Sequence, residues 1–148
     1  MSRLFSESAK MVQFNSISHQ GNDEIAEHCC SLMQARGLTV ELQQVFHSRE
    51  GVSKRQFNVI GTLGDTLVDR TTQDGLLFIS NLDTPNPGLS EHWIETKGKP
   101  QIAQEYNDKL FGLGAHAKTD FLCKLSAINK SKNKKLLMPV YLVGACGS

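Results

Sequence analysis

Three stretches of the chain carry apolar residues at helical spacing. The spacing predicts helices over residues 3–14, 22–36 and 117–130. Asn22 stands at the N-cap position of the second helix, ahead of two carboxylates in its first turn, and Gly37 supplies the C-terminal stop. The expected buried face of that helix is Ile25, Ala26, Cys29, Leu32 and Met33.

Other stretches read as strands. A period of two predicts strands over residues 38–46 and 57–63. The continuous apolar runs at residues 76–80 and 136–143 are typical of strands that are buried on both faces. Two short extended pieces are expected at 102–105 and 109–111. The order of elements predicts a three-layer α/β arrangement with a mixed sheet and flanking helices.

Polar segments separate these elements. Residues 47–55 and 65–74 are expected to be surface connections, and residues 130–135 a solvated helix end followed by a loop. Pro139 is at odds with its strand, because proline removes a donor from the ladder. A buried strand so close to the last residue leads us to expect an incomplete fold, with no second domain in residues 1–148.

Composition excludes several classes of protein. The 148 residues include 16 Lys and Arg against 15 Asp and Glu, so no strong field favours a polyanion. Aromatic residues make up 7%, too few for a nucleic-acid stacking platform. No apolar run approaches the roughly 20 residues of a membrane span, and no signal peptide is visible. We expect a cytoplasmic protein whose four cysteines are reduced, with no nucleic-acid or membrane partner.

One glycine motif admits two interpretations. Gly112-x-Gly114-x-x-Ala117 opens a predicted helix and fits the dinucleotide fingerprint in its Gly/Ala form. The ribose contact requires an acidic residue about 20 positions later, yet no Asp or Glu follows Asp120. The alternative is a strand-to-helix turn that needs two glycines. A small nucleotide-binding α/β protein therefore stays as a minor hypothesis.

A second candidate site follows the strand at residues 76–80. Asn81 and Asp83 stand two apart, which places both side chains on one side of the strand end, where open α/β sheets build their sites. Both are also ordinary turn residues. His116 and Asp120 have structural readings too, as a surface residue at the helix start and a charge in the first turn.

Seven motifs in their order along the chain resemble the N-terminal part of the catalytic domain of the M20 metallopeptidases. Among its members the sequence looks most like acetylornithine deacetylase and succinyl-diaminopimelate desuccinylase, and the resemblance covers about residues 8–148. The motifs are Phe14-Asn15-Ser16-Ile17-Ser18, Asn22-Asp23-Glu24-Ile25-Ala26-Glu27, Arg36-Gly37-Leu38-Thr39-Val40-Glu41, Phe57-Asn58-Val59-Ile60-Gly61, Leu77-Phe78-Ile79-Ser80-Asn81-Leu82-Asp83-Thr84-Pro85, Lys109 to Lys118 and Val140-Tyr141-Leu142-Val143-Gly144.

The resemblance implies a zinc-exopeptidase-like sheet and two zinc or cobalt ions, with a Glu as general base. The family's metal-binding His corresponds to Asn81, while the Asp that orients its ring remains as Asp83. The bridging Asp corresponds to Ala117. His116 and Asp120 are possible substitute ligands. The family's pair of Glu residues would begin where this sequence stops.

These departures predict a zinc-dependent amidohydrolase scaffold that binds no metal and has no activity in this form. The resemblance implies a small N-acyl amino acid as substrate and a dimerisation domain that this sequence lacks. The alternative is a non-catalytic binding module on the same scaffold.

Overall fold

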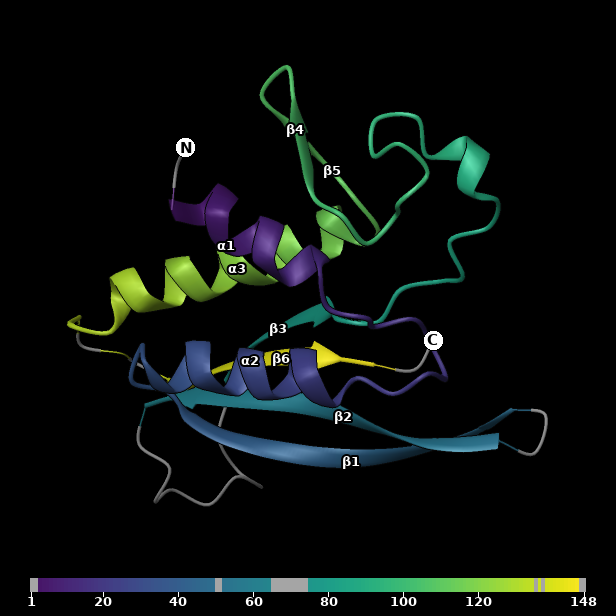
Figure 1. Ribbon diagram of the computed structural model, residues 1–148. Helices are drawn as coiled ribbons and strands as arrows, with labels where there is room; N and C mark the ends of the chain where they lie inside the picture. The colour runs from purple at the N-terminus through teal and green to yellow at the C-terminus, as the bar shows by residue number, and fades with distance from the viewer. Residues whose placement is uncertain (1–2, 50–51, 65–74, 135, 137, 147–148) are drawn as a thin grey trace.

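The computed structural model describes residues 3–49, 52–64, 75–134, 136 and 138–146. Figure 1 shows a curved sheet with helices packed above it and an irregular segment that leads to a small hairpin. The helices and strands, in chain order, are α1 (Arg3–Val12), α2 (Asp23–Gln34), β1 (Thr39–Arg49), β2 (Val52–Leu63), β3 (Leu76–Asn81), the short 3₁₀ helix η1 (Ser90–His92), β4 (Gln104–Tyr106), β5 (Lys109–Phe111), α3 (Ala115–Ser131) and β6 (Val140–Ala145).

The main sheet has the strand order β1-β2-β6-β3, and β4 and β5 form a separate hairpin. β1 and β2 are antiparallel neighbours, β2 and β6 are antiparallel, and β3 runs parallel to β6. The connection from β3 to the parallel β6 passes through α3, as parallel strands require a long crossover. The mixed α/β sheet with flanking helices that the sequence predicts is therefore confirmed.

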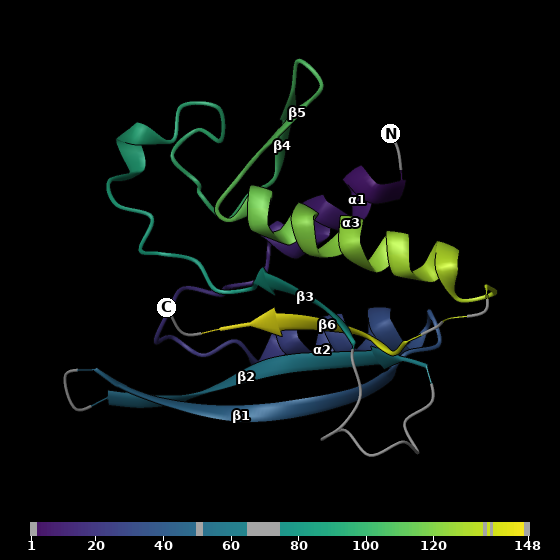
Figure 2. The same cartoon turned by 180° about the vertical axis from the view of Figure 1, so that it is seen from behind.

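All three α-helices cover the same face of the sheet. α2 packs on β1 and β2, α3 packs on β3 and β6, and α1 packs on α3 (Figure 2). Leu142 of β6 and Val59 of β2 point into this layer and are fully buried. The helical residues that share their cluster are Met11, Ile25, Ala26, Cys29, Met33, Phe121, Leu122, Leu125 and Ile128. The predicted buried stripes of the second and third helices are thus confirmed, except that Leu32 is only half-buried.

The helices differ from the predicted spans by at most two residues at either end. The first helix ends at Val12 rather than residue 14, and the second at Gln34 rather than residue 36. Gly37 has φ +83°, a left-handed conformation that ends the helix as predicted. No helix in the described part of the chain is long and apolar enough to cross a membrane.

The β1–β2 ribbon is longer than predicted. Residues 47–49 and 52–55, expected to be a polar connection, pair with each other and extend both strands. In Figure 1 this end of the ribbon extends away from the helices. The alternation of apolar and polar residues that marks a half-buried strand is absent from the sequence there. The predicted connection at 65–74 lies outside the described residues.

The prediction that residues 76–80 are buried on both faces is wrong. β3 is an edge strand in the described sheet, and Leu77 and Ile79 are 55% and 54% exposed. Their side chains point to the face opposite the helices, whereas Ser80 faces α3 and is buried. Pro139 raises no difficulty, because β6 begins one residue later and the Pro139 carbonyl accepts a hydrogen bond from the Leu76 amide.

Asn22 has a different role from the predicted cap. It precedes α2, but its side chain makes no capping hydrogen bond. Its Nδ2 donates to the Phe57 carbonyl at 2.9 Å, and its Oδ1 accepts from the Phe57 amide at 2.8 Å. Phe57 lies on β2 beyond the part of the strand that pairs with β6, so the Asn22 side chain supplies the partners of its backbone N–H and C=O groups. Asn22 thereby joins the start of α2 to the sheet.

Replacing Asn22 with alanine is expected to lower the free energy of unfolding by about 2 kcal/mol, because both backbone groups of Phe57 lose their partner. Urea denaturation of the purified chain measures this loss. Asn133→Ala, at an exposed position, is the control and is expected to change stability by less than about 0.5 kcal/mol. Equal stability of the two variants would show that the Asn22 contacts contribute nothing.

Candidate functional site

The end of β3 and the glycine turn before α3 lie side by side, as the motif order predicts. A Cβ atom on Gly114 would overlap Thr84 Cγ2, so the two backbones are in close contact. The segment after α1 closes the third side. Ser18 donates its amide to the Thr84 carbonyl, and Thr84 donates its amide to the Ser16 carbonyl, each at 2.8 Å.

Both glycines of the turn are required by their surroundings. Gly112 has φ +150° and Gly114 has φ +72°, conformations that L side chains rarely adopt. A Cβ at Gly112 would overlap Val12, which is fully buried. Close packing therefore accounts for both glycines, as in the strand-to-helix alternative, and the dinucleotide reading gains no support from them.

The structure places the candidate ligand Asn81 and the candidate orienting residue Asp83 at the end of β3 with very different exposure. Asn81 is the last residue of β3 and is exposed, whereas Asp83 is only 8% exposed. The Asp83 Oδ2 accepts a hydrogen bond from Ser18 Oγ at 2.7 Å. In this structure Asp83 therefore fastens the segment after α1 to the end of β3.

Ala117 lies in the first turn of α3 and offers no ligand atom. Its neighbour His116 is exposed and lines a hollow of about 470 Å³ between α1, α3 and the β4–β5 hairpin. That hollow does not include Asn81 or Asp83. The two candidate regions of the sequence are therefore close in their backbones, while His116 faces a different cavity.

Asp120 is committed to an ion pair. Its Oδ2 lies 2.6 Å from the Lys124 Nζ and accepts a hydrogen bond from Ser80 Oγ at 2.7 Å. Partial burial works to raise the pKa of Asp120, but the hydrogen bonds from Lys124 and Ser80 outweigh it and lower the pKa. It lies in the second turn of α3, so the expected first-turn charge is wrong, because the helix begins at Ala115.

The described residues do not fit a zinc site. No group of three or more His, Cys, Asp or Glu residues lies close enough together to hold a metal ion in the described part of the chain. Zinc in proteins is held by at least three such ligands. The exposed amide of Asn81, the methyl group of Ala117 and the engaged carboxylates of Asp83 and Asp120 do not supply them.

The sequence reasoning missed Lys118, the largest fully buried side chain. Its Nζ donates to the Phe14 carbonyl at 3.4 Å, and its stem passes beside Gly114. Burial lowers the pKa of Lys118 to about 8. A sequence signal was present, because Lys118 occupies the same helical stripe as Phe121, Leu122 and Leu125, where a polar residue is out of place.

Cys146 is the thiol nearest this edge of the sheet, and its environment keeps it protonated. Burial and the carboxylate of Asp83 raise the pKa of Cys146 to about 11. Burial also raises the pKa of the Cys29 and Cys30 thiols. Nucleophilic cysteines require a lowered pKa, so the direction of these shifts does not favour a nucleophilic role for the three thiols.

Comparisons by sequence give no relative. The sequence matches no protein-family model, and no curated protein matches it significantly.

Comparisons by structure place the fold. Human carnosine dipeptidase 1 superposes with a TM-score of 0.69 at 16% identity, over 95% of this chain and 31% of its own. The dipeptidase Dug1p from Saccharomyces cerevisiae gives 0.68 at 13% identity, over 97% and 32%. The glutaminyl cyclase of Fimbriiglobus ruber gives 0.62 at 13% identity, over 98% and 44%.

These likenesses extend over nearly the whole of this chain but less than half of each matched chain. Proteins with two different chemistries, peptide hydrolysis and glutaminyl cyclisation, appear among them. The level of identity supports a conclusion about architecture alone. The chain has the fold that these dipeptidases and glutaminyl cyclases share.

Proposed function

We propose that this chain is a non-catalytic derivative of an M20-like amidohydrolase scaffold, which binds no catalytic zinc and hydrolyses no amide bond by itself. One observation carries the proposal. At the edge where the resemblance puts the metal, the side chains that remain are tied into the fold, Asp83 to Ser18 and Asp120 to Lys124. A metal ion would have to compete with these contacts for the oxygens that make them.

The finer part of the proposal concerns ancestry. The motif order favours an enzyme of the acetylornithine deacetylase type and the N-terminal part of its catalytic domain. On this proposal the ancestral substrate was a small N-acyl amino acid handled in the cytoplasm. The His-to-Asn and Asp-to-Ala departures at Asn81 and Ala117 mark the loss of that activity.

A second candidate is a binding module that has kept the scaffold for its surface. The observation in its favour is the outer face of β3, where Leu77 and Ile79 are more than half exposed next to the half-buried Tyr141 and Val143 of β6. Exposed apolar residues that adjoin on a sheet edge are typical of contact surfaces.

The proposal predicts that the purified 148-residue chain, dialysed after incubation with zinc, retains less than about 0.1 zinc per chain by elemental analysis, because fewer than three ligands converge. With added zinc it is expected not to hydrolyse N-acetylornithine. Asn81→His combined with Ala117→Asp is expected to restore no turnover, because no general base is introduced and such a base contributes about 10²–10⁴-fold.

Stoichiometric zinc would contradict the proposal, as would chelator-sensitive hydrolysis of N-acetylornithine. His116→Ala and Asp120→Asn variants then identify the ligand, since these two are the possible substitutes. A variant at the exposed His92 serves as the control for loss of a histidine far from the strand end.

A further inference from the structure

A polar pocket lies where the ends of α2 and α3 meet the start of α1. Its volume is about 270 Å³. Leu122 is buried beneath it, and Ser126 and Asn129 of α3 line it. Its charged lining residues are Arg3 and Glu7 of α1, Arg36 just after α2 and Lys132 just after α3. It is separate from the edge that carries Asn81 and Asp83, none of whose residues line it.

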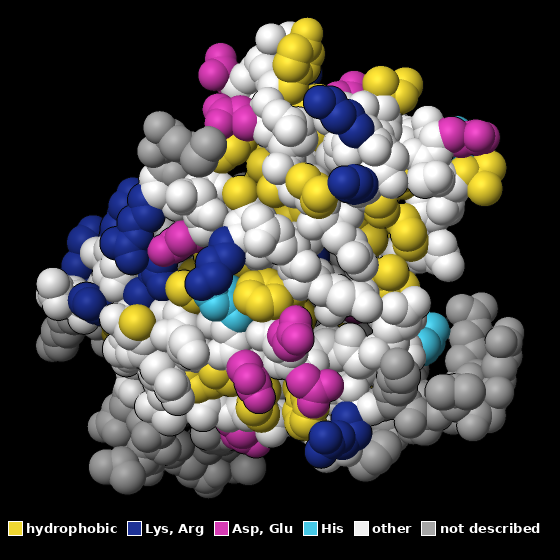
Figure 3. Space-filling model, viewed as in Figure 1, with side chains coloured by type: hydrophobic (Ala, Val, Ile, Leu, Met, Phe, Trp, Pro, Cys, Tyr) yellow, Lys and Arg dark blue, Asp and Glu magenta, His cyan; other side chains and the backbone are white. Residues whose placement is uncertain are grey.

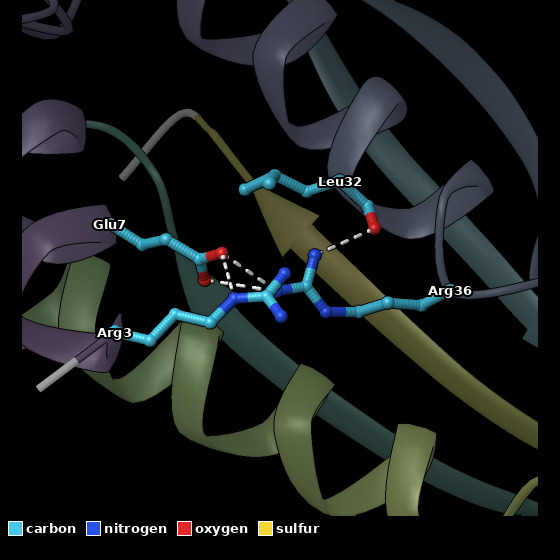
Figure 4. A network of polar contacts seen from close by, with 4 residues as sticks. All are labelled: Arg3, Glu7, Leu32 and Arg36. Atoms are coloured by element: carbon cyan, nitrogen blue, oxygen red, sulfur yellow. Dashed lines mark hydrogen bonds and ion pairs between the residues drawn. The ribbon is translucent and has the colours of Figure 1, made fainter.

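Two arginines share one carboxylate at this pocket (Figure 4). The Arg36 Nη2 lies 2.9 and 3.1 Å from the two oxygens of Glu7, and its Nη1 donates to the Leu32 carbonyl at 3.0 Å. The Arg3 Nε donates to Glu7 Oε1 at 3.1 Å. Glu7 can neutralise only one of the two guanidinium groups, so a positive charge is left over.

Lys132 adds a further cation to the lining, which brings the net charge of the pocket to +2. The Arg3 side chain is 83% exposed, and its two terminal nitrogens have no partner among the described residues. Lys130 and Lys134 are exposed on the flanking segment. Figure 3 shows Lys and Arg side chains gathered over this end of α3. Free cationic donors around a small pocket are suited to a phosphate group.

Asn129 supplies an observation of a different kind. Its Oδ1 atom is buried and has no hydrogen-bond partner among the described residues, although the side chain lines the pocket. A buried acceptor without a donor costs about 1–3 kcal/mol. When the Asn129 amide group turns toward the pocket, a hydroxyl group of a ligand can donate to this oxygen, which a bare phosphate at neutral pH does less well.

We propose that this pocket binds a small phosphorylated polyol, with the phosphate between Arg3 and Lys132 and a hydroxyl group on the Asn129 Oδ1. The pocket is slightly smaller than typical ligand sites, which run from roughly 300 to 1,000 Å³, and this agrees with a small ester. The phosphate provides affinity through charge, and the hydroxyl group distinguishes the ester from inorganic phosphate.

Calorimetric titration of the full chain with glucose 6-phosphate, inorganic phosphate and glucose tests this site. We expect the ester to bind about tenfold more tightly than phosphate, and glucose not to bind. Arg3→Gln and Lys132→Gln are each expected to weaken ester binding about tenfold. Asn129→Leu is expected to weaken binding of the ester to the affinity of inorganic phosphate. Lys97→Gln, which makes the same charge change on an exposed loop, is the control and should have no effect.

Two results would overturn the proposal. One is that the ester shows no saturable binding up to about 10 mM, a concentration well above the Kd of a specific site. The other is an equal loss of binding in Lys97→Gln and Lys132→Gln, which would show general attraction to a cationic surface. Melting curves establish that each variant is folded, so a loss of binding by an intact Lys132→Gln chain supports the site.

The same chemistry could reach the pocket as a lipid headgroup. Sedimentation with phosphatidylcholine vesicles that contain phosphatidylinositol 4-phosphate separates the two sources. Binding of the soluble ester with no retention on these vesicles assigns a free ligand, and retention that Asn129→Leu abolishes assigns the headgroup. Equal retention on phosphatidylserine vesicles, without ester binding, would contradict the proposal, because the phosphatidylserine headgroup carries no phosphomonoester and no polyol hydroxyl groups.

Discussion

Replacing Lys118 with methionine is expected to raise the free energy of unfolding by about 3 kcal/mol at pH 7. The Lys118 side chain is 1% exposed, and burial lowers its pKa from 10.5 to about 8. Each pKa unit corresponds to about 1.4 kcal/mol of differential stability between the two protonation states. Methionine has a similar length and no charge, so it fills the same space without the cost of desolvation.

The gain is expected to disappear as the pH rises. Below about pH 8 the lysine is protonated in both the folded and the unfolded chain, and the folded state carries the full cost of the buried charge. Between about pH 8 and 10.5 the folded chain has lost the proton while the unfolded chain still holds it, so stability increases with pH in this range. Above that range the wild-type chain and Lys118→Met should have similar stability.

Urea denaturation of both chains at pH 7, 9 and 10.5 measures this difference, and other groups that titrate at high pH cancel in the comparison. Lys130→Met, at an exposed position on the same helix, is the control and should change stability by less than about 0.5 kcal/mol at each pH. A Lys118→Met chain that is less stable at pH 7 would show that the contact with the Phe14 carbonyl outweighs the desolvation cost.

The helices were predictable because each has a buried stripe of continuous helical period. Ile25, Cys29 and Met33 are fully buried as that period requires. Strand ends were harder to predict, because they depend on the partner strand rather than on local pattern. The end of the β1–β2 ribbon near Arg49 and Val52 was missed, because its length is fixed by the pairing of the two strands, which the local sequence pattern does not show.

The sequence could not indicate which apolar run would be central in the sheet. The runs at residues 76–80 and 136–143 look alike, yet β6 lies between two strands and β3 lies at the edge. Strand order is a property of tertiary packing, and no feature of a short apolar run encodes it.

The candidate site shows the same limit. The positions of Asn81 and Ala117 were readable as departures from a family pattern. The partners of Asp83 and Asp120 lie 65 positions away and one helical turn away. The ion pair of Asp120 with Lys124 could have been predicted from the sequence, since the two residues stand at i and i+4 on a predicted helix. The contact of Asp83 with Ser18 depends on how the segment after α1 returns to the end of β3, which only the folded structure shows.

Replacing Gly114 with alanine is expected to lower the free energy of unfolding by about 4 kcal/mol. Two costs add. A left-handed conformation disfavours an alanine by about 1–2 kcal/mol, and overlap of the new Cβ with Thr84 Cγ2 costs a further 1–3 kcal/mol. A comparison with Gly88 separates the backbone cost from the overlap cost. Its φ of +71° matches the +72° of Gly114, but no atom lies within 4 Å of the position that its Cβ would take. Gly88→Ala should therefore show the backbone cost alone, about 1–2 kcal/mol.

Thr84→Ser then isolates the overlap, because serine lacks the Cγ2 methyl group and keeps the hydroxyl group. If contact with Thr84 holds the glycine turn against the end of β3, Gly114→Ala should cost about 1–3 kcal/mol less in the Thr84→Ser background than in the wild-type chain. The Gly88→Ala variant should cost the same in both backgrounds. Strict additivity of Gly114→Ala and Thr84→Ser would mean that the two segments do not meet in solution, and the juxtaposition of the glycine turn with the β3 end would have to be abandoned.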